Sequence, residues 1–147
     1  ARVPDPADEQ SFRSAKLDHS ERHRHAALYA LHRDLLRIRR QDAVIARQDR
    51  QAFDAAVLSE HAFVLRWFEP RDGDRLLVVN LGEGVDLRPA PEPLLAPPRS
   101  ARWRLLWSSD DPRYDGHGAV SPCTEAGWRL PGESAALLCA EAEPART

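Results

Sequence analysis

The sequence predicts a mainly β protein, an antiparallel β-sandwich preceded by one long amphipathic α-helix. Within residues 61–87, two runs of alternating apolar residues flank a turn rich in Pro, Gly and Asp, which is typical of a β-hairpin. Further short apolar runs separated by turn residues follow, as in a sandwich. Before the hairpin, residues 21–41 lack Pro and Gly and repeat Leu and Ile at helical spacing.

The first part of the chain predicts a loop and then the helix. Residues 1–20 contain prolines and many polar side chains, so we expect only a turn of helix around Ser11 to Ala15. Ser20 is the expected N-cap of the helix over 21–41. The helix carries an apolar stripe that some surface must cover: Leu28, Leu31, Leu35 and Ile38.

The hairpin within residues 61–87 is the expected centre of the sheet. Asp72 and Gly73 tolerate the left-handed backbone conformation that a tight reversal needs. Large apolar groups occur on both faces of both strands, so we expect the hairpin to be covered on both sides. On this basis Leu65 and Val79 are expected in the core.

The remaining strands are shorter. A weak alternation over 53–58 predicts a first strand that pairs with the hairpin. Residues 88–100 contain several prolines, each of which deletes a ladder donor, so we assign them to an edge or a crossing loop. The last strands are expected over 103–107, 128–130 and 134–140.

The composition disfavours several kinds of partner. The 147 residues include 21 basic and 23 acidic side chains, and the net charge of -2 favours neither nucleic acid nor a membrane surface. No apolar run approaches a membrane span and no stretch resembles a signal peptide, so we expect a cytoplasmic protein. The opening resembles the middle of a loop and has no Met, so we expect a fragment of a longer protein. Cys123 and Cys139 are expected to be free thiols.

Two clusters contain residue types that can ligate metals. The first is a set of histidines at the predicted helix: His19, His23, His25 and His32. The second is an acidic loop: Asp110, Asp111, Asp115 and His117. No carboxylate or thiol completes a zinc set around the histidines, and the loop departs from the register of a calcium-binding EF-hand. We therefore expect no metal site and no cofactor.

Catalytic motifs are missing from the sequence. It contains no nucleophile elbow, P-loop or dinucleotide fingerprint, and nothing marks a carboxylate pair for glycosidase chemistry. Aromatic faces suit sugar rings, although tryptophans in strands more often belong to the core. Three tryptophans are candidates for a sugar-stacking platform: Trp103, Trp107 and Trp128.

Several motifs, in order along nearly the whole chain, resemble the C-terminal part of the malto-oligosyltrehalose trehalohydrolases. They are VPDP at residues 3–6, Ser14 with Lys16-Leu17-Asp18, the helix end Ile38-Arg39-Arg40, Asn80 after a valine strand, and Trp107-Ser108-Ser109 before the acidic loop. These enzymes form a branch of the α-amylase superfamily. Two positions depart from the usual family pattern: His19 replaces a tryptophan and Asp115 replaces a glycine.

The resemblance implies how the chain divides. Family members have a (β/α)8 barrel followed by an antiparallel β-sandwich. Residues 1–42 would then be the loop and last helix of the barrel, and residues 43–147 the C-terminal sandwich. The helix would pack against the catalytic barrel of the same polypeptide.

The resemblance also implies where the chemistry lies. The catalytic carboxylates would stand on earlier barrel strands, so this chain would carry no catalytic residue. The whole enzyme would release trehalose from maltooligosyl trehalose by a retaining mechanism with two carboxylates. Three residues on the loop at the catalytic end of the barrel are candidates for bordering the substrate cleft: Asp5, Lys16 and Asp18.

Two other functions stay open. The four tryptophans of the chain favour a carbohydrate-binding sandwich of another α-amylase-superfamily enzyme. The loop from Asp110 to His117 could instead serve an independent enzyme. If the barrel is absent, the helix over 21–41 is expected to self-associate or to fray, because its apolar stripe would be exposed.

Overall fold

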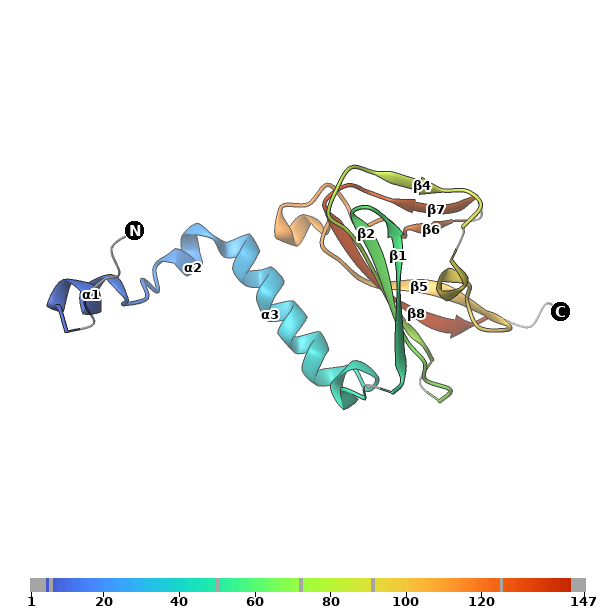
Figure 1. The fold of residues 1–147 in the computed structure, drawn as a ribbon, viewed down its shortest axis with the longest axis horizontal. Helices are drawn as coiled ribbons and strands as arrows, with labels where there is room; N and C mark the ends of the chain where they lie inside the picture. Colours follow the sequence, from blue (N-terminus) through green and yellow to red (C-terminus); the bar gives the residue numbers. More distant parts are fainter. Residues whose placement is uncertain are drawn as a thin grey trace.

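The computed structural model describes residues 5, 7–49, 51–71, 73–90, 92–124 and 126–143. Figure 1 shows a β-sandwich preceded by helices, so the predicted mainly β fold class is confirmed. The larger sheet has the order β1-β2-β3-β8-β5 and the smaller one β4-β7-β6, with antiparallel pairing throughout. The strands are β1 (Phe53–Ser59), β2 (Ala62–Trp67), β3 (Arg75–Asn80), β4 (Val85–Leu87), β5 (Ala101–Ser108), β6 (Cys123–Thr124), β7 (Gly127–Leu130) and β8 (Ser134–Ala142).

The helical segment is broken where a single helix was predicted. The helices are α1 (Glu9–Ser14), α2 (Glu21–Arg24) and α3 (Ala26–Gln41), with the 3-10 turns η1 (Ile45–Arg47), η2 (Pro93–Leu95) and η3 (Pro112–Tyr114). His25 interrupts the predicted helix with φ -115° and ψ 47°, and Ser20 makes no side-chain cap hydrogen bond. Helices in proteins are stabilised mainly by tertiary packing, and α2 buries no residue, so nothing holds its polar sequence in line with α3.

The predicted central hairpin is confirmed as β2 and β3, paired from Ala62 opposite Asn80 to Trp67 opposite Arg75. The turn between them needs glycine. Gly73 has φ 75°, and a Cβ there would lie 2.6 Å from a backbone oxygen of β8. Asp72, the other expected turn residue, lies outside the described residues.

The core lies between the two sheets. Val64 and Leu76 are fully buried on the inner face of the hairpin and pack with side chains of the smaller sheet such as Trp128. Leu65 and Val79, expected in the core, instead lie half-buried on the outer face. The pleat sends alternate side chains to opposite faces, and the smaller sheet covers only one of them. The expected cover on both sides is therefore found, but it is complete only on the inner face, and the outer face is half-buried.

The proline-rich segment over 88–100 forms no strand in its described part and crosses from the smaller sheet to the larger one through η2, as predicted. A buried arginine holds it. Arg66 donates to Asp74 at 2.7 and 2.9 Å and to two carbonyl oxygens beside η2, those of Leu94 and Ala96. The arginine thereby satisfies backbone acceptors that proline-rich sequence leaves without ladder partners.

Asn80 joins the two sheets where β3 ends. Its side-chain amide donates to the carbonyl oxygens of Glu83 and Pro131 at 2.7 and 2.9 Å, and its Oδ1 accepts from the backbone of Gly82. A buried amide needs such partners. The motif of an asparagine after a valine strand therefore has a structural role.

Candidate functional site

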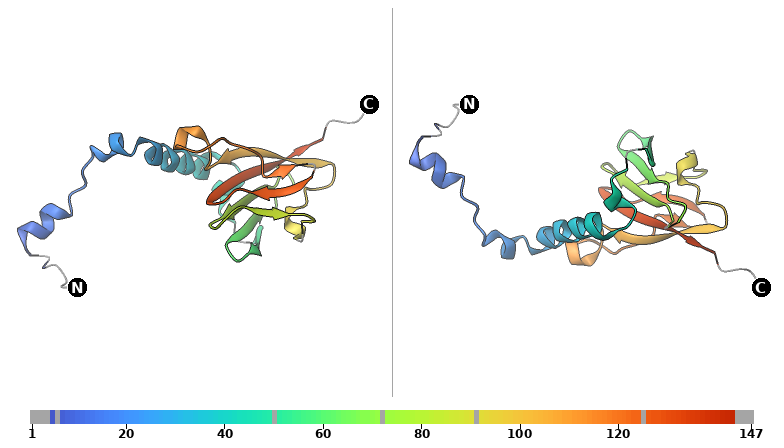
Figure 2. Two further views of the ribbon diagram at one scale, coloured as in Figure 1. Left: turned by 90° about the horizontal axis from the view of Figure 1, so that it is seen from above. Right: turned by 90° about the horizontal axis from the view of Figure 1, so that it is seen from below.

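The three residues that were candidates for the substrate cleft lie on the N-terminal segment. In both views of Figure 2, α1 and α2 extend away from the sandwich. Asp5 and Asp18 each accept a bond from a backbone amide two residues ahead, and Lys16 lies over the ring of Phe12 at 4.9 Å. The bonds from Ser20 lower the pKa of the Asp18 carboxyl. The structure does not join these residues into a site.

The acidic loop is an internally bonded turn. Asp111 caps η3 and pairs with Arg113, while Asp110 accepts from the backbone of His117 at 3.0 Å. Asp115 has φ 62°, a conformation that glycine adopts more easily, which fits the glycine that the resemblance implies at this position. Of the four helix histidines, His32 bonds to the carbonyl oxygen of Leu28. No group of three or more potential ligands that could hold a metal occurs among the described residues.

The three candidate tryptophans form no sugar-stacking platform and are core residues, the alternative that the sequence favoured. The three tryptophans are each at most 8% exposed. Trp103 donates its indole N–H to the carbonyl oxygen of Leu95 at 2.8 Å. Trp107 donates to the hydroxyl of Tyr114 at 3.3 Å. Buried rings cannot stack on a sugar, so these three tryptophans cannot serve as a platform.

A polar cluster fastens α3 to the outer face of the larger sheet. The side chain of Asp34 is only 4% exposed, and it accepts hydrogen bonds from Tyr114 Oη at 2.8 Å and from Arg113 Nη1 at 3.3 Å. Arg37 and Arg33 lie 3.4 and 3.7 Å from its other oxygen. The hydroxyl of Tyr114 both accepts from Trp107 and donates to Asp34, so helix, loop and sheet share one network.

The charges in this network act on its titrating groups. The bond from Tyr114, together with the nearby arginines, holds the pKa of the Asp34 carboxyl below its usual value against the opposing effect of burial. Burial and the bond to Asp34 raise the pKa of the Tyr114 hydroxyl. Both shifts favour an ionised Asp34 and a protonated Tyr114, the pair that makes this bond.

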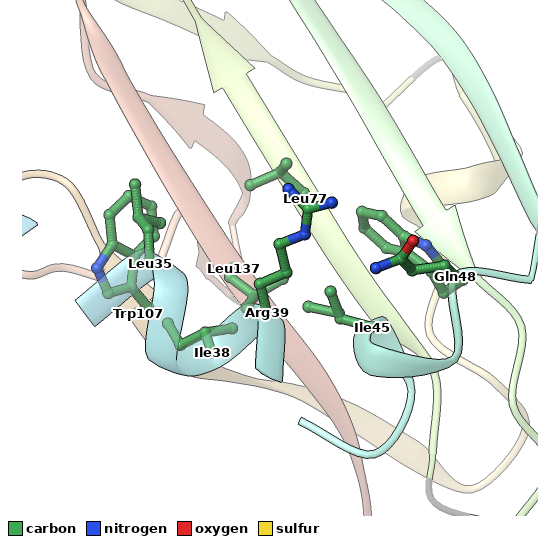
Figure 3. A pocket seen from close by; sticks show the side chains of 9 residues that line it. Leu35, Ile38, Arg39, Ile45, Gln48, Leu77, Trp107 and Leu137 are labelled. Carbon is green, nitrogen blue, oxygen red and sulfur yellow. The ribbon is translucent and has the colours of Figure 1, made fainter. Parts of the chain in front are cut away.

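Beside the network, a cavity of about 320 Å³ opens between α3, η1 and the outer face of the sheet (Figure 3). Ile38 and Arg39 reach it from α3, and Ile45 from η1. Its other wall is aliphatic and aromatic: Trp67, Leu77, Trp107 and Leu137. We call this cavity the α3 groove. None of its lining residues is a carboxylate, histidine, cysteine or hydroxyl, so its chemistry suits docking of an apolar surface.

Sequence reasoning missed both the network and the groove. One signal was available for the network, because Asp34 interrupts the apolar stripe between Leu31 and Ile38. A carboxylate on an apolar helix face needs a partner. Nothing in the sequence pointed to Tyr114 as that partner, since the two residues are 80 positions apart.

The geometry defines a β-sandwich that carries a helix and an apolar groove, with no acid–base constellation in the groove. The chain belongs to the DUF3459 family (Domain of unknown function), whose profile matches residues 50–137. It is also 38% identical over 85 residues to a malto-oligosyltrehalose trehalohydrolase of Deinococcus radiodurans. These matches confirm the resemblance inferred from the motifs.

The aligned part covers 55% of this chain but only 14% of that protein, so the chain spans a small part of its relative. No solved structure matches the chain. Within the described residues, every helix is too short or too polar to cross a membrane.

Proposed function

We propose that this chain is the C-terminal, non-catalytic portion of a glycoside hydrolase that releases trehalose from maltooligosyl trehalose. The observation that carries the proposal is the 38% identity to a trehalohydrolase over 85 residues. The family match over 50–137 and the sandwich fold agree with it.

In this proposal the catalytic carboxylates belong to a barrel that precedes the chain, and residues 1–42 complete that barrel. Asp5, Lys16 and Asp18 would border its substrate cleft. Their exposure on a segment that extends from the sandwich supports this role, because it leaves them accessible to another part of the polypeptide. The sandwich from residue 43 would support the barrel.

The test is to read the gene upstream of Ala1 and to assay the encoded protein. We expect a barrel with the catalytic carboxylates, and trehalose release from maltooligosyl trehalose by the whole protein but not by the 147-residue chain. An upstream region without such a barrel would reject the proposal. Cytoplasmic location stays a prediction, and fractionation of the source cells would test it.

A further inference from the structure

Strand β1 forms an open edge of the larger sheet. Among the described residues it pairs only with β2, and no strand lies on its other side (Figure 1). An edge of this kind presents unpaired amides and carbonyls to which another strand can bond. The strand is seven residues long, Phe53–Ser59, and its pairing with β2 is regular as far as Val57.

The other sheet edges are poor templates for strand pairing. The edge strand β5 has a register shift between Leu105 and Trp107, and it carries the exposed charges of Arg102 and Arg104. The edges of the smaller sheet, β4 and β6, are only three and two residues long. Bulges, charges and short strands are the features by which proteins block pairing at an edge. On β1 the only charged side chain is Asp54.

The register shows which residues of β1 offer their backbone groups at the open edge. The amide of Phe68 donates to the carbonyl oxygen of Ala52 at 2.8 Å. Bonded pairs recur at every second residue of an antiparallel ladder, so Asp54 and Ala56 bond to β2. The residues between them direct their amides and carbonyls outward: Phe53, Ala55 and Val57. In agreement, the amide of Ala55 donates to Oδ1 of Asp54 at 2.8 Å.

These outward residues are self-complementary when two copies meet antiparallel. If Ala55 lies opposite its own copy, Phe53 of one chain lies opposite Val57 of the other, and each facing pair exchanges both backbone bonds. Phe53 and Val57 are 42% and 79% exposed, so this register would bring together two apolar side chains that water now reaches. Asp54 would lie opposite Ala56, so the two carboxylates would not face each other directly.

We propose that the open edge of β1 pairs with β1 of a second copy, antiparallel and centred on Ala55. The two larger sheets then join into one across a two-fold axis, with the same surface used by both copies. This interface goes beyond the proposed function and does not depend on it. Asp54 opposes the pairing, because its carboxylate occupies the Ala55 amide that must bond to the partner.

Disulfide trapping tests the register. Ala55→Cys in the 147-residue chain, oxidised with diamide, should give a crosslinked dimer, because the facing Cα atoms would lie about 5.5 Å apart. Val57→Cys is the matched control, since Val57 is 79% exposed but would lie about 13 Å along the strand from its own copy. The wild type, with Cys123 and the buried Cys139, controls for the native thiols. Absence of the dimer in Ala55→Cys, or equal crosslinking in Val57→Cys, would overturn the proposal.

A proline substitution tests the backbone bonds. Ala55→Pro removes an amide that faces the open edge and leaves the bonds to β2 in place. In sedimentation equilibrium it should raise the Kd of the dimer about tenfold, because each copy loses a hydrogen bond. Asp54→Ala should lower the Kd, since it frees the Ala55 amide, and an unchanged Kd would overturn the opposing role of Asp54.

One further variant separates this edge from the exposed apolar side chains of α3. Leu35→Glu places a charge where Leu35 is 39% exposed on the helix, and it should leave the Kd of the dimer unchanged. A chain that stays monomeric at every concentration, or a dimer that Leu35→Glu weakens and Ala55→Pro does not, would overturn the proposal. Circular dichroism checks that Ala55→Pro is folded, and if it is not, the trapping experiment decides.

Discussion

The hydroxyl of Tyr114 donates a 2.8 Å hydrogen bond to Oδ2 of Asp34, and so joins the loop after β5 to the middle of α3. The bond lies beside Trp107 and Leu137, which α3 covers on the outer face of the sheet. The second half of α3 therefore packs on the sandwich. In the isolated chain, the Tyr114–Asp34 bond and this packing can hold α3 on the sandwich. The expectation that the helix frays or self-associates did not consider these contacts.

The first prediction concerns this bond. Tyr114→Phe removes the donor to Asp34, so the amides of residues 34–41 should exchange hydrogen faster and the Tm should fall. Tyr29→Phe is the matched control, because Tyr29 is 46% exposed on the same helix. Hydrogen exchange followed by mass spectrometry measures both variants. Unchanged exchange in Tyr114→Phe would mean that the bond does not fasten α3.

The second prediction concerns pH. The folded pKa of Asp34 lies below its ordinary value of 3.8, so ionised Asp34 stabilises the fold above that pH. This contribution should be lost as the pH falls through the folded pKa. Asp34→Asn should therefore lower the Tm at pH 7, and the difference from the wild type should shrink below pH 3.8. If the Tm difference between Asp34→Asn and the wild type stays constant from pH 7 to below pH 3.8, ionised Asp34 is not the stabilising form.

The third prediction separates the two faces of the hairpin. Leu76→Ala opens a cavity in the sealed core and should lower the free energy of unfolding by about 2–5 kcal/mol. Leu65→Ala should lower it less, because Leu65 is half-buried on the outer face. Urea denaturation of the two variants provides the comparison. Equal losses would show that the outer face is as well packed as the inner one.

The fourth prediction concerns the loop after β5. A Cβ at Gly116 would lie 2.2 Å from the backbone carbon of Asp110, so Gly116→Ala should displace the loop that carries Tyr114 and lower the Tm. Gly84→Ala is the control, since a Cβ there would meet its neighbours at no less than 3.6 Å. If both variants have the same Tm as the wild type, the close approach of Gly116 to Asp110 does not contribute to the stability of the fold.

The strands could be predicted from local patterns because alternation and turn residues act over a few positions. The strands at 53–58, 103–107, 128–130 and 134–140 all appear close to their expected bounds. The two shortest strands, β4 and β6, were missed. Each has three residues or fewer, too few for an alternation to be recognised, and pairing with β7 alone makes them strands.

By itself, the sequence determined the sandwich, the hairpin at its centre and the resemblance to trehalohydrolases, since periodicity and motifs are properties of neighbouring residues. Only the tertiary structure decided which face of the hairpin is fully buried, how far Trp103, Trp107 and Trp128 are buried, and that Asp34 meets Tyr114. Those outcomes depend on which surfaces meet when distant segments pack. Leu65 and Leu76 are equally apolar in the sequence, but the smaller sheet covers only the face that carries Leu76.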